Sequence, residues 1–268
     1  MTLPLFRPDD DPGPNFVDLL RKLGQQPFRS DRPGNSGFDV AHGTTIAAIR
    51  YAEGVVMAGD RRATAGSSIA HRAMEKVHPA DRHSGVAIAG AAGPAMEMVK
   101  LFQLQLEHYE KVEGTALSLE GKANQLSAMV RANLPAAMQG MVVVPIFAGY
   151  DTREATGRLF AYDVTGGRYE ERDQVSTGSG SMQAATVVKV GYHPGLSRDE
   201  SIELCVKALW EAAEADSATG GPDPVRGVYP VVATITATGF ERVSDDELAE
   251  RFQAVAAAER ARQSEGPR

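Results

Sequence analysis

Residues 42–46, His-Gly-Thr-Thr-Ile, open the first regular apolar stretch of the chain, and residues 57–64, Met-Ala-Gly-Asp-Arg-Arg-Ala-Thr, follow it. A third short segment, Glu-Lys-Val, occupies residues 75–77. The apolar runs at 45–50 and 55–58 predict two strands joined by a turn at 52–54. On its own, Gly-Thr-Thr-Ile is only the start of a strand. Asp60 follows Thr44 at the same spacing at which Lys76 follows Asp60, so the three segments are considered together.

The composition indicates one sizeable globular domain with tails, because the chain has 268 residues, 43% of them hydrophobic, and a formal net charge of −7. The mild acidity argues against a nucleic-acid partner, since DNA- and RNA-binding domains usually present a basic face. Cys205, the single cysteine, is predicted to be a buried small apolar side chain rather than a reactive thiol. One cysteine permits no intrachain disulfide, which favours a reducing cytoplasm. No segment has the apolar length of a membrane span.

Residues 1–43 differ from the rest of the chain and are predicted to be a weakly structured leader. Prolines punctuate this polar stretch, which also carries Asp9, Asp10 and Asp11. Only residues 16–23 could form a short helix. A continuous apolar core is missing, so the stretch is not a secretory signal. The predicted boundaries are 1–43 for the leader and 44–268 for the domain.

After the leader, apolar periodicity predicts an alternation of strands and helices. Further strands are expected at 84–90, 142–148, 158–163 and 229–237, with a hairpin turn at Gly166 and Gly167. Helices are expected at 95–113 and 119–139, after Gly178, and at 199–216 and 245–262. The predicted apolar faces of the first two helices contain Met96, Val99, Leu101, Leu104 and Leu106, and Leu126, Met129, Val130, Leu134 and Met138. This order suits two packed sheets with helices on both outer faces.

Several common catalytic sites are missing from the sequence. There is no Gly-rich loop ending in Gly-Lys-Ser/Thr and no pair of histidines with metal-ligand spacing. The segment Gly-Ser-Gly-Ser at 178–181 resembles a phosphate cradle, but it lacks the downstream lysine and the third glycine. No cofactor or metal is therefore expected.

The combination of Thr44, Asp60 and Lys76 at this spacing resembles the N-terminal threonine proteases. The resemblance runs from Thr44 almost to the C-terminus and is to the β subunits of the proteasome, within the N-terminal nucleophile hydrolases. Details of the actinobacterial branch are Gly-Asp-Arg-Arg at 59–62, Leu-Glu-His-Tyr-Glu-Lys at 106–111 and Asp-Ser-Ala-Thr-Gly-Gly-Pro-Asp at 216–223. The fold implied is α+β, a four-layer αββα sandwich of two stacked antiparallel sheets flanked by helices.

The resemblance implies that the chain cuts itself between Gly43 and Thr44. The new α-amine could then act as the base that a threonine hydroxyl needs, because its reference pKa of about 7.7–8.0 lies well below the value of about 10.4 for lysine. The threonine methyl stiffens χ1 and holds the hydroxyl. The attack on the Gly43 carbonyl demands a tight, kinked backbone, which glycine tolerates without a Cβ cost.

The family also implies roles for neighbouring residues. Lys76 would lie beside Thr44 and lower the pKa of the nucleophile's surroundings, and Asp60 would hold Lys76. On the residues alone, this Asp/Lys pair could also be a surface salt bridge. Gly90 maps to the backbone N–H donor of the oxyanion site, and Thr64 and Ala92 map to positions that contact the substrate backbone. The small residues around Gly90 could instead simply pack against a helix.

Further positions would orient the amine and accept the substrate side chain. Ser179 and Asp216 match the orienting pair, and Thr219 stands where many β subunits have serine, so its hydrogen bond is expected to survive. The specificity pocket would be lined by Ala63, Met74, His78, Ile88, Ala92 and Met96. Most are apolar and none is acidic, which suggests an apolar or broad preference. Met74 and Met96 could alternatively be core residues.

The function implied is that of a threonine endopeptidase subunit in four stacked seven-membered rings, with α subunits outside and β subunits inside. In the actinobacterial branch, an ATPase ring of the ARC/Mpa type feeds this cytoplasmic core with unfolded, Pup-tagged proteins. Three alternatives remain. One is a subunit of the related HslV protease, which is shorter after its threonine. The others are a non-catalytic ring subunit and an amidohydrolase of the same superfamily acting on small amides.

Overall fold

The structure is a computed structural model that describes residues 43–264. The short helix expected at 16–23 lies outside the described residues.

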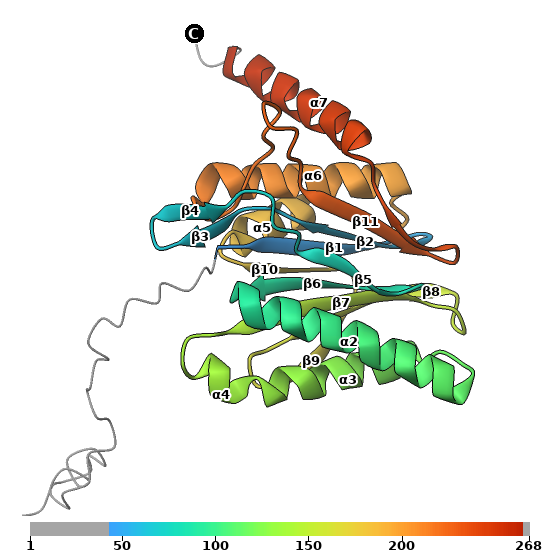
Figure 1. Ribbon diagram of the computed structural model, residues 1–268. Helices are drawn as coiled ribbons and strands as arrows, with labels where there is room; N and C mark the ends of the chain where they lie inside the picture. The colour runs from blue at the N-terminus through green and yellow to red at the C-terminus, as the bar shows by residue number, and fades with distance from the viewer. Residues whose placement is uncertain (1–42, 265–268) are drawn as a thin grey trace, which may run out of the picture. The chain divides into compact units, whose positions relative to one another are not determined.

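Two five-stranded antiparallel sheets stack face to face (Figure 1). The first has the order β10-β1-β2-β11-β12, with strands at Gln174–Gly178, Thr45–Tyr51, Gly54–Gly59, Val231–Thr236 and Gly239–Arg242. The second has the order β5-β6-β7-β8-β9, with strands at Val77–Asp81, Ser84–Gly90, Val143–Asp151, Thr156–Tyr162 and Arg168–Glu171. A separate short hairpin pairs β3 with β4, at Ala63–Ala65 and Ser68–His71.

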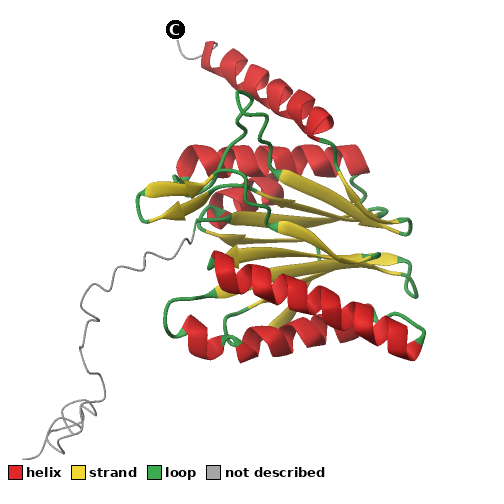
Figure 2. Cartoon of the chain, in the orientation of Figure 1, coloured by secondary structure: helices red, strands yellow, loops and turns green. Residues whose placement is uncertain are grey.

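Helices cover the outer face of each sheet (Figure 2). The second sheet is covered by α2, α3 and α4, at Ala92–Glu113, Leu119–Ala132 and Leu134–Ala137. The first is covered by α5 and α6, at Ser181–Gly191 and Arg198–Ala215, with α7 at Asp245–Ser264 packed against α6. Within residues 43–264, no helix is both long and apolar enough to cross a bilayer. The four layers confirm the predicted αββα sandwich.

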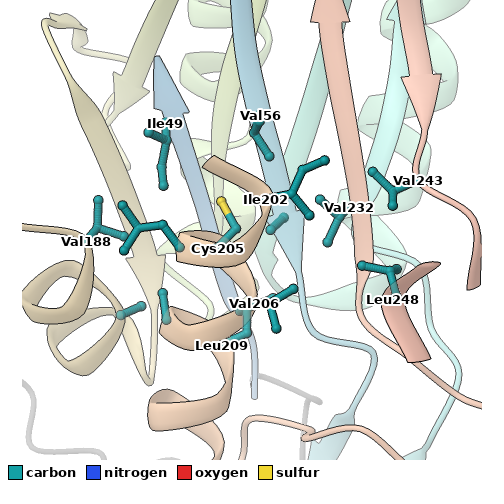
Figure 3. Packing of buried hydrophobic residues seen from close by; sticks show 14 of the residues in the cluster. Ile49, Val56, Val188, Ile202, Cys205, Val206, Leu209, Val232, Val243 and Leu248 are labelled. Carbon is teal, nitrogen blue, oxygen red and sulfur yellow. The ribbon is translucent and has the colours of Figure 1, made fainter. Parts of the chain in front are cut away.

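The central strands β1, β2 and β11 of the first sheet are buried on both faces, and their side chains alternate between two cores. Ile46 and Ala48 of β1 point into the core between the sheets, whereas Ile49 and Tyr51 belong to the core beneath α6. Figure 3 shows α6 placing Ile202, Cys205, Val206 and Leu209 against this second face. Cys205 is fully buried there, and burial raises the pKa of its thiol to about 12, in keeping with its expected apolar role.

The helix expected at 95–113 begins three residues earlier, and part of its predicted apolar face is wrong. Leu101 is 44% exposed and Leu104 is 62% exposed. The buried stripe instead follows the helical period and contains Ala95, Met98, Val99, Phe102 and Leu106. Gly114 ends the helix in the left-handed conformation, as expected from its sequence position.

The single helix expected at 119–139 is two helices, α3 and α4. Pro135 lies just past the break, and a proline inside a helix removes a backbone donor and clashes with the carbonyl four residues earlier. Met138, expected on the apolar face, is largely exposed as a result. The prediction for Leu126 and Val130 was correct, since both are buried.

Candidate active site

Thr44 lies immediately before β1 and is 4% exposed. Its backbone carbonyl accepts a hydrogen bond from Ser179 N at 2.8 Å, which attaches it to the start of the segment leading into α5. Its hydroxyl donates to the carbonyl oxygen of Gly43 at 2.6 Å. The hydroxyl of the predicted nucleophile is thus next to the carbonyl group that self-cleavage would attack.

Asp60 lies in the turn after β2, is fully buried and accepts four hydrogen bonds. Its Oδ1 accepts Thr45 N at 2.8 Å and Lys76 Nζ at 2.6 Å. Its Oδ2 accepts the backbone N–H groups of Arg62 and Gly220, both at 2.8 Å. A buried carboxylate needs this degree of pairing, because an unpaired buried charge is strongly unfavourable. The alternative of a surface salt bridge between Asp60 and Lys76 is therefore wrong.

Lys76 precedes β5, and its side chain is 1% exposed. Besides Asp60, its ammonium donates to the carbonyl oxygens of Gly43 at 3.1 Å and Arg62 at 2.5 Å. Burial lowers the pKa of Lys76, although the Asp60 carboxylate opposes this shift. Lys76 and the Thr44 hydroxyl both donate to the Gly43 carbonyl oxygen, which polarises that carbonyl group.

A second acidic group, Asp216, lies at the end of α6. Its Oδ2 accepts the hydroxyls of Ser179 at 2.5 Å and Thr219 at 2.6 Å. Its Oδ1 accepts Ala218 N at 3.1 Å. Burial raises the pKa of Asp216, but these hydrogen bonds outweigh burial and leave the pKa below its usual value. Ser179 Oγ in turn accepts Thr44 N at 3.4 Å, so Asp216 reaches the nucleophile through Ser179.

Thr219 was expected to orient the Thr44 amine, and the structure gives it a less direct place. It is fully buried, and its hydroxyl lies 2.6 Å from that of Thr45 while donating to Asp216. Its connection to the Thr44 nitrogen therefore passes through Asp216 and Ser179.

Gly43 is required by space rather than by an unusual backbone angle. Its φ lies outside the left-handed region that favours glycine. A Cβ at this position would overlap the hydroxyl of Thr64 and would lie 2.6 Å from the Cβ of Ala218. Thr64, expected near the substrate backbone, is thus adjacent to the residue that precedes the nucleophile.

Gly90 ends β6 with φ +115°, and a Cβ there would overlap the carbonyl of Val142. Glycine is therefore needed for a close approach of two backbone segments. Ala92, the first residue of α2, is half-buried. Within residues 43–264, neither residue joins the side-chain hydrogen-bond network around Thr44.

The predicted pocket residues occupy two kinds of surroundings. Ala63 is buried on β3, and Met74 is half-buried just before Lys76. His78 Nε2 lies 3.2 Å from the carbonyl oxygen of Glu75, and burial lowers the pKa of its imidazole. Ile88 and Met96 pack in the core beneath α2, so for Met96 the alternative of a core role fits the structure.

Five residues of the network were given no role in the sequence analysis. They are Thr45, Arg62, Gly180, Ala218 and Gly220. Thr45 carried a usable signal, because it is a hydroxyl residue at the start of a strand that is otherwise apolar. In residues 43–264, no three His, Cys, Asp or Glu side chains gather as a metal-binding group.

Known proteins resemble this chain over most of its length. A family model described as "Proteasome subunit" matches residues 40–225. A protein named "Proteasome subunit beta" from Acidimicrobium ferrooxidans is 57% identical over 250 residues, which cover 93% of this chain and 92% of that protein. A protein of the same name from Streptomyces griseus is 51% identical over 257 residues, covering 95% of this chain and 91% of that protein.

These matches cover nearly the whole chain and confirm the predicted resemblance to actinobacterial β subunits over the HslV alternative. Members of the family are protease subunits of a multi-subunit core that also contains α subunits. This chain belongs to the proteasome subunit family and is a β subunit of a 20S proteasome core.

Proposed function

We propose that this subunit is a threonine endopeptidase whose nucleophile is Thr44, exposed by self-cleavage after Gly43. The observation that carries the proposal is the convergence of the Thr44 hydroxyl and the buried Lys76 ammonium on the Gly43 carbonyl oxygen. A subunit kept only for assembly would have no need of a charge buried at this cost.

For self-cleavage, Oγ1 of Thr44 would add to the carbonyl carbon of Gly43 while the hydroxyl proton passes to the departing nitrogen. The Gly43–Thr44 C–N bond then breaks and leaves an ester on Oγ1. Water hydrolyses this ester, which releases residues 1–43 and leaves a free α-amine on Thr44. Lys76 stabilises the negative charge that develops on the Gly43 oxygen, because its ammonium already donates to that atom.

In the mature subunit, the α-amine of Thr44 serves as the base for its own hydroxyl. An α-amine has a reference pKa of about 7.7–8.0, so a useful fraction is neutral near pH 7. Ser179, held by Asp216, accepts from the Thr44 nitrogen and would orient the amine. The hydroxyl attacks a substrate carbonyl, the peptide amine leaves, and water hydrolyses the acyl-enzyme. We assign the oxyanion donor to the backbone N–H of Gly90, and substrate-backbone contacts to Thr64 and Ala92.

The substrate side chain would enter a pocket formed by Ala63, Met74, His78 and Ala92 near residues 88–96. None of these is acidic, which supports an apolar or broad preference. We further propose that the rings are sevenfold, that the particle works in the cytoplasm, and that an ATPase ring delivers unfolded, Pup-tagged proteins. These assignments rest on the resemblance to the actinobacterial branch, to whose β subunits this chain is similar.

The direct test of the proposed function compares Thr44→Ala with Thr44→Ser in particles assembled with an α subunit. Thr44→Ala removes the nucleophile and should lower hydrolysis of a fluorogenic peptide by at least about a hundredfold. Thr44→Ser keeps a hydroxyl and should retain measurable activity. Near-parental hydrolysis by assembled Thr44→Ala particles would show that another residue is the nucleophile.

A further inference from the structure

Thr45, the second residue of the proposed mature chain, is a fully buried polar side chain on β1. Its backbone pairs with Asp60 in both directions, because Thr45 N donates to Asp60 Oδ1 at 2.8 Å and Asp60 N donates to Thr45 O at 3.1 Å. The neighbouring side chains of β1 from Ile46 to Ile49 are buried and apolar, so a hydroxyl buried at Thr45 needs a specific set of partners.

The hydroxyl of Thr45 has two partners, and their chemistry fixes the direction of the hydrogen bonds. Gly180 N donates to Thr45 Oγ1 at 2.9 Å. Thr219 Oγ1, 2.6 Å from Thr45 Oγ1, uses its one proton on the carboxylate of Asp216. Thr45 must therefore donate to Thr219. The result is a directed chain from Gly180 through Thr45 and Thr219 to Asp216.

The space around this chain is closely filled. A Cβ on Gly180 would lie 2.5 Å from Thr45 Oγ1 and 2.8 Å from Thr219 Oγ1. The two hydroxyls thus lie against the backbone at the start of α5, with no space for a side chain at Gly180.

We propose that Thr45 is a positioning residue for the peptidase reaction. Its backbone contacts the Asp60–Lys76 pair, and its hydroxyl contacts the Thr219–Asp216–Ser179 group that holds the Thr44 nitrogen. Thr45 therefore fixes the two halves of the site relative to each other. This inference rests on the proposed threonine-protease function.

The test replaces Thr45 by Val, which keeps the branched shape and removes the hydroxyl, and by Ser, which keeps the hydroxyl. Misplacing a catalytic group slightly can cost up to about a hundredfold in rate, so Thr45→Val should lower kcat by about 10- to 100-fold. KM should stay unchanged, because Thr45 is buried and does not reach the substrate. Thr45→Ser should restore most of kcat.

The matched control is Thr234→Val on β11, another buried threonine of the same sheet, whose hydroxyl makes a contact of only 3.5 Å with Glu241 O. It should leave kcat and KM unchanged. Activity is measured with a fluorogenic peptide on assembled particles, normalised to the number of sites titrated by a covalent threonine-directed inhibitor. The double variant Thr45→Val/Thr219→Val should be scarcely worse than either single variant, because both remove the same link.

Two results would overturn the inference while leaving the proposed function intact. The first is a parental kcat for Thr45→Val. The second is an equal loss of kcat in Thr45→Val and Thr45→Ser. In each case Thr44→Ala must be inactive in the same assay. If Thr45→Val fails to assemble, Thr219→Val tests the same hydrogen bond from its other partner. A parental kcat for Thr219→Val would overturn the inference. Activity in Thr44→Ala particles would instead contradict the proposed function itself.

Discussion

At the scale of single residues, the site is organised around a buried carboxylate with every acceptor position in use. Asp60 Oδ2 accepts hydrogen bonds from two backbone N–H groups. Its Oδ1 accepts one from a backbone N–H group and one from the Lys76 ammonium. In an Asp60→Asn variant, the NH₂ group of the amide would face two of these hydrogen-bond donors in either orientation of the amide. The carboxylate therefore serves both the local fold and the position of Lys76.

Lys76→Ala should abolish measurable peptide hydrolysis and block leader removal, because the same ammonium serves both reactions. Loss of such an electrostatic contribution typically costs about a hundredfold or more in rate. Lys76→Arg should not fully rescue activity, since a planar guanidinium cannot occupy the position of an ammonium. Asp60→Asn should destabilise the fold by about 3–5 kcal/mol, because it leaves a buried charge uncompensated.

The matched control is Lys111→Ala, which removes an exposed helical ion pair with Glu107 and should change neither activity nor melting temperature measurably. Peptide hydrolysis and the mass of the β chain are measured on assembled particles. If Lys76→Ala particles remove the leader and hydrolyse peptide at near-parental rates, then Lys76 is only a structural partner of Asp60.

Thr44, Asp60 and Lys76 were predicted as neighbours through the resemblance to the N-terminal threonine proteases. On the residues alone, Asp60 and Lys76 could also have formed a surface salt bridge. Gly220 could not be predicted as a partner of Asp60, since 160 residues separate them. The hydroxyl of Thr219 was expected to keep its hydrogen bond, but its partners Asp216 and Thr45 depend on how the loop after α6 packs. Such contacts depend on tertiary packing rather than on local pattern.

At the scale of elements, the junction of β10 with α5 determines how closely the two halves of the site approach. Gly178 has φ +104°, and a Cβ there would overlap the carbonyl of Thr44. Gly180, at the N-terminus of α5, has φ −93°, an angle that any residue adopts. It must be glycine only because its neighbours leave no space.

Gly180→Ala should therefore lower both stability and activity, because the added methyl displaces the hydroxyls of Thr45 and Thr219. Gly93→Ala, in the first turn of α2, is the matched control. A Cβ at Gly93 meets no atom within 4 Å, so this change should leave activity unaltered and stabilise the fold by up to about 1 kcal/mol. Thermal unfolding and peptide hydrolysis of both variants check this pair. If Gly180→Ala and Gly93→Ala have the same melting temperature and the same activity, the junction of β10 with α5 is not closely packed.

Long elements were predicted better than short ones, for identifiable reasons. β1 and β2 were found because two apolar runs flank a turn, and in the structure both strands are buried between two cores. β5 was missed because it is short and contains Pro79, which an edge strand tolerates. β4 was missed because all of its residues are exposed, so it has no apolar pattern. The exposed Leu101 and Leu104 on α2 show that an apolar residue in a helix need not face the core.

At the scale of the whole molecule, the site collects residues from the start of β1, the turn after β2, the approach to β5 and the ends of β10 and α6. The stacked sheets hold these segments together, since each belongs to a strand or helix with a buried core. The order of strands and helices suited two packed sheets with helices outside, and the family resemblance implied the four-layer sandwich. The order could not reveal how the loop after α6 meets the turn after β2.

The central claim is that Thr44 becomes the N-terminal residue through its own hydroxyl. The most direct measurement is the intact mass and N-terminal sequence of the β chain after co-assembly with an α subunit, for the parent and for Thr44→Ala. The account predicts that the parent chain begins at Thr44 and lacks residues 1–43, whereas Thr44→Ala keeps them. A parent chain that begins elsewhere, or efficient leader removal by Thr44→Ala without added protease, would contradict it.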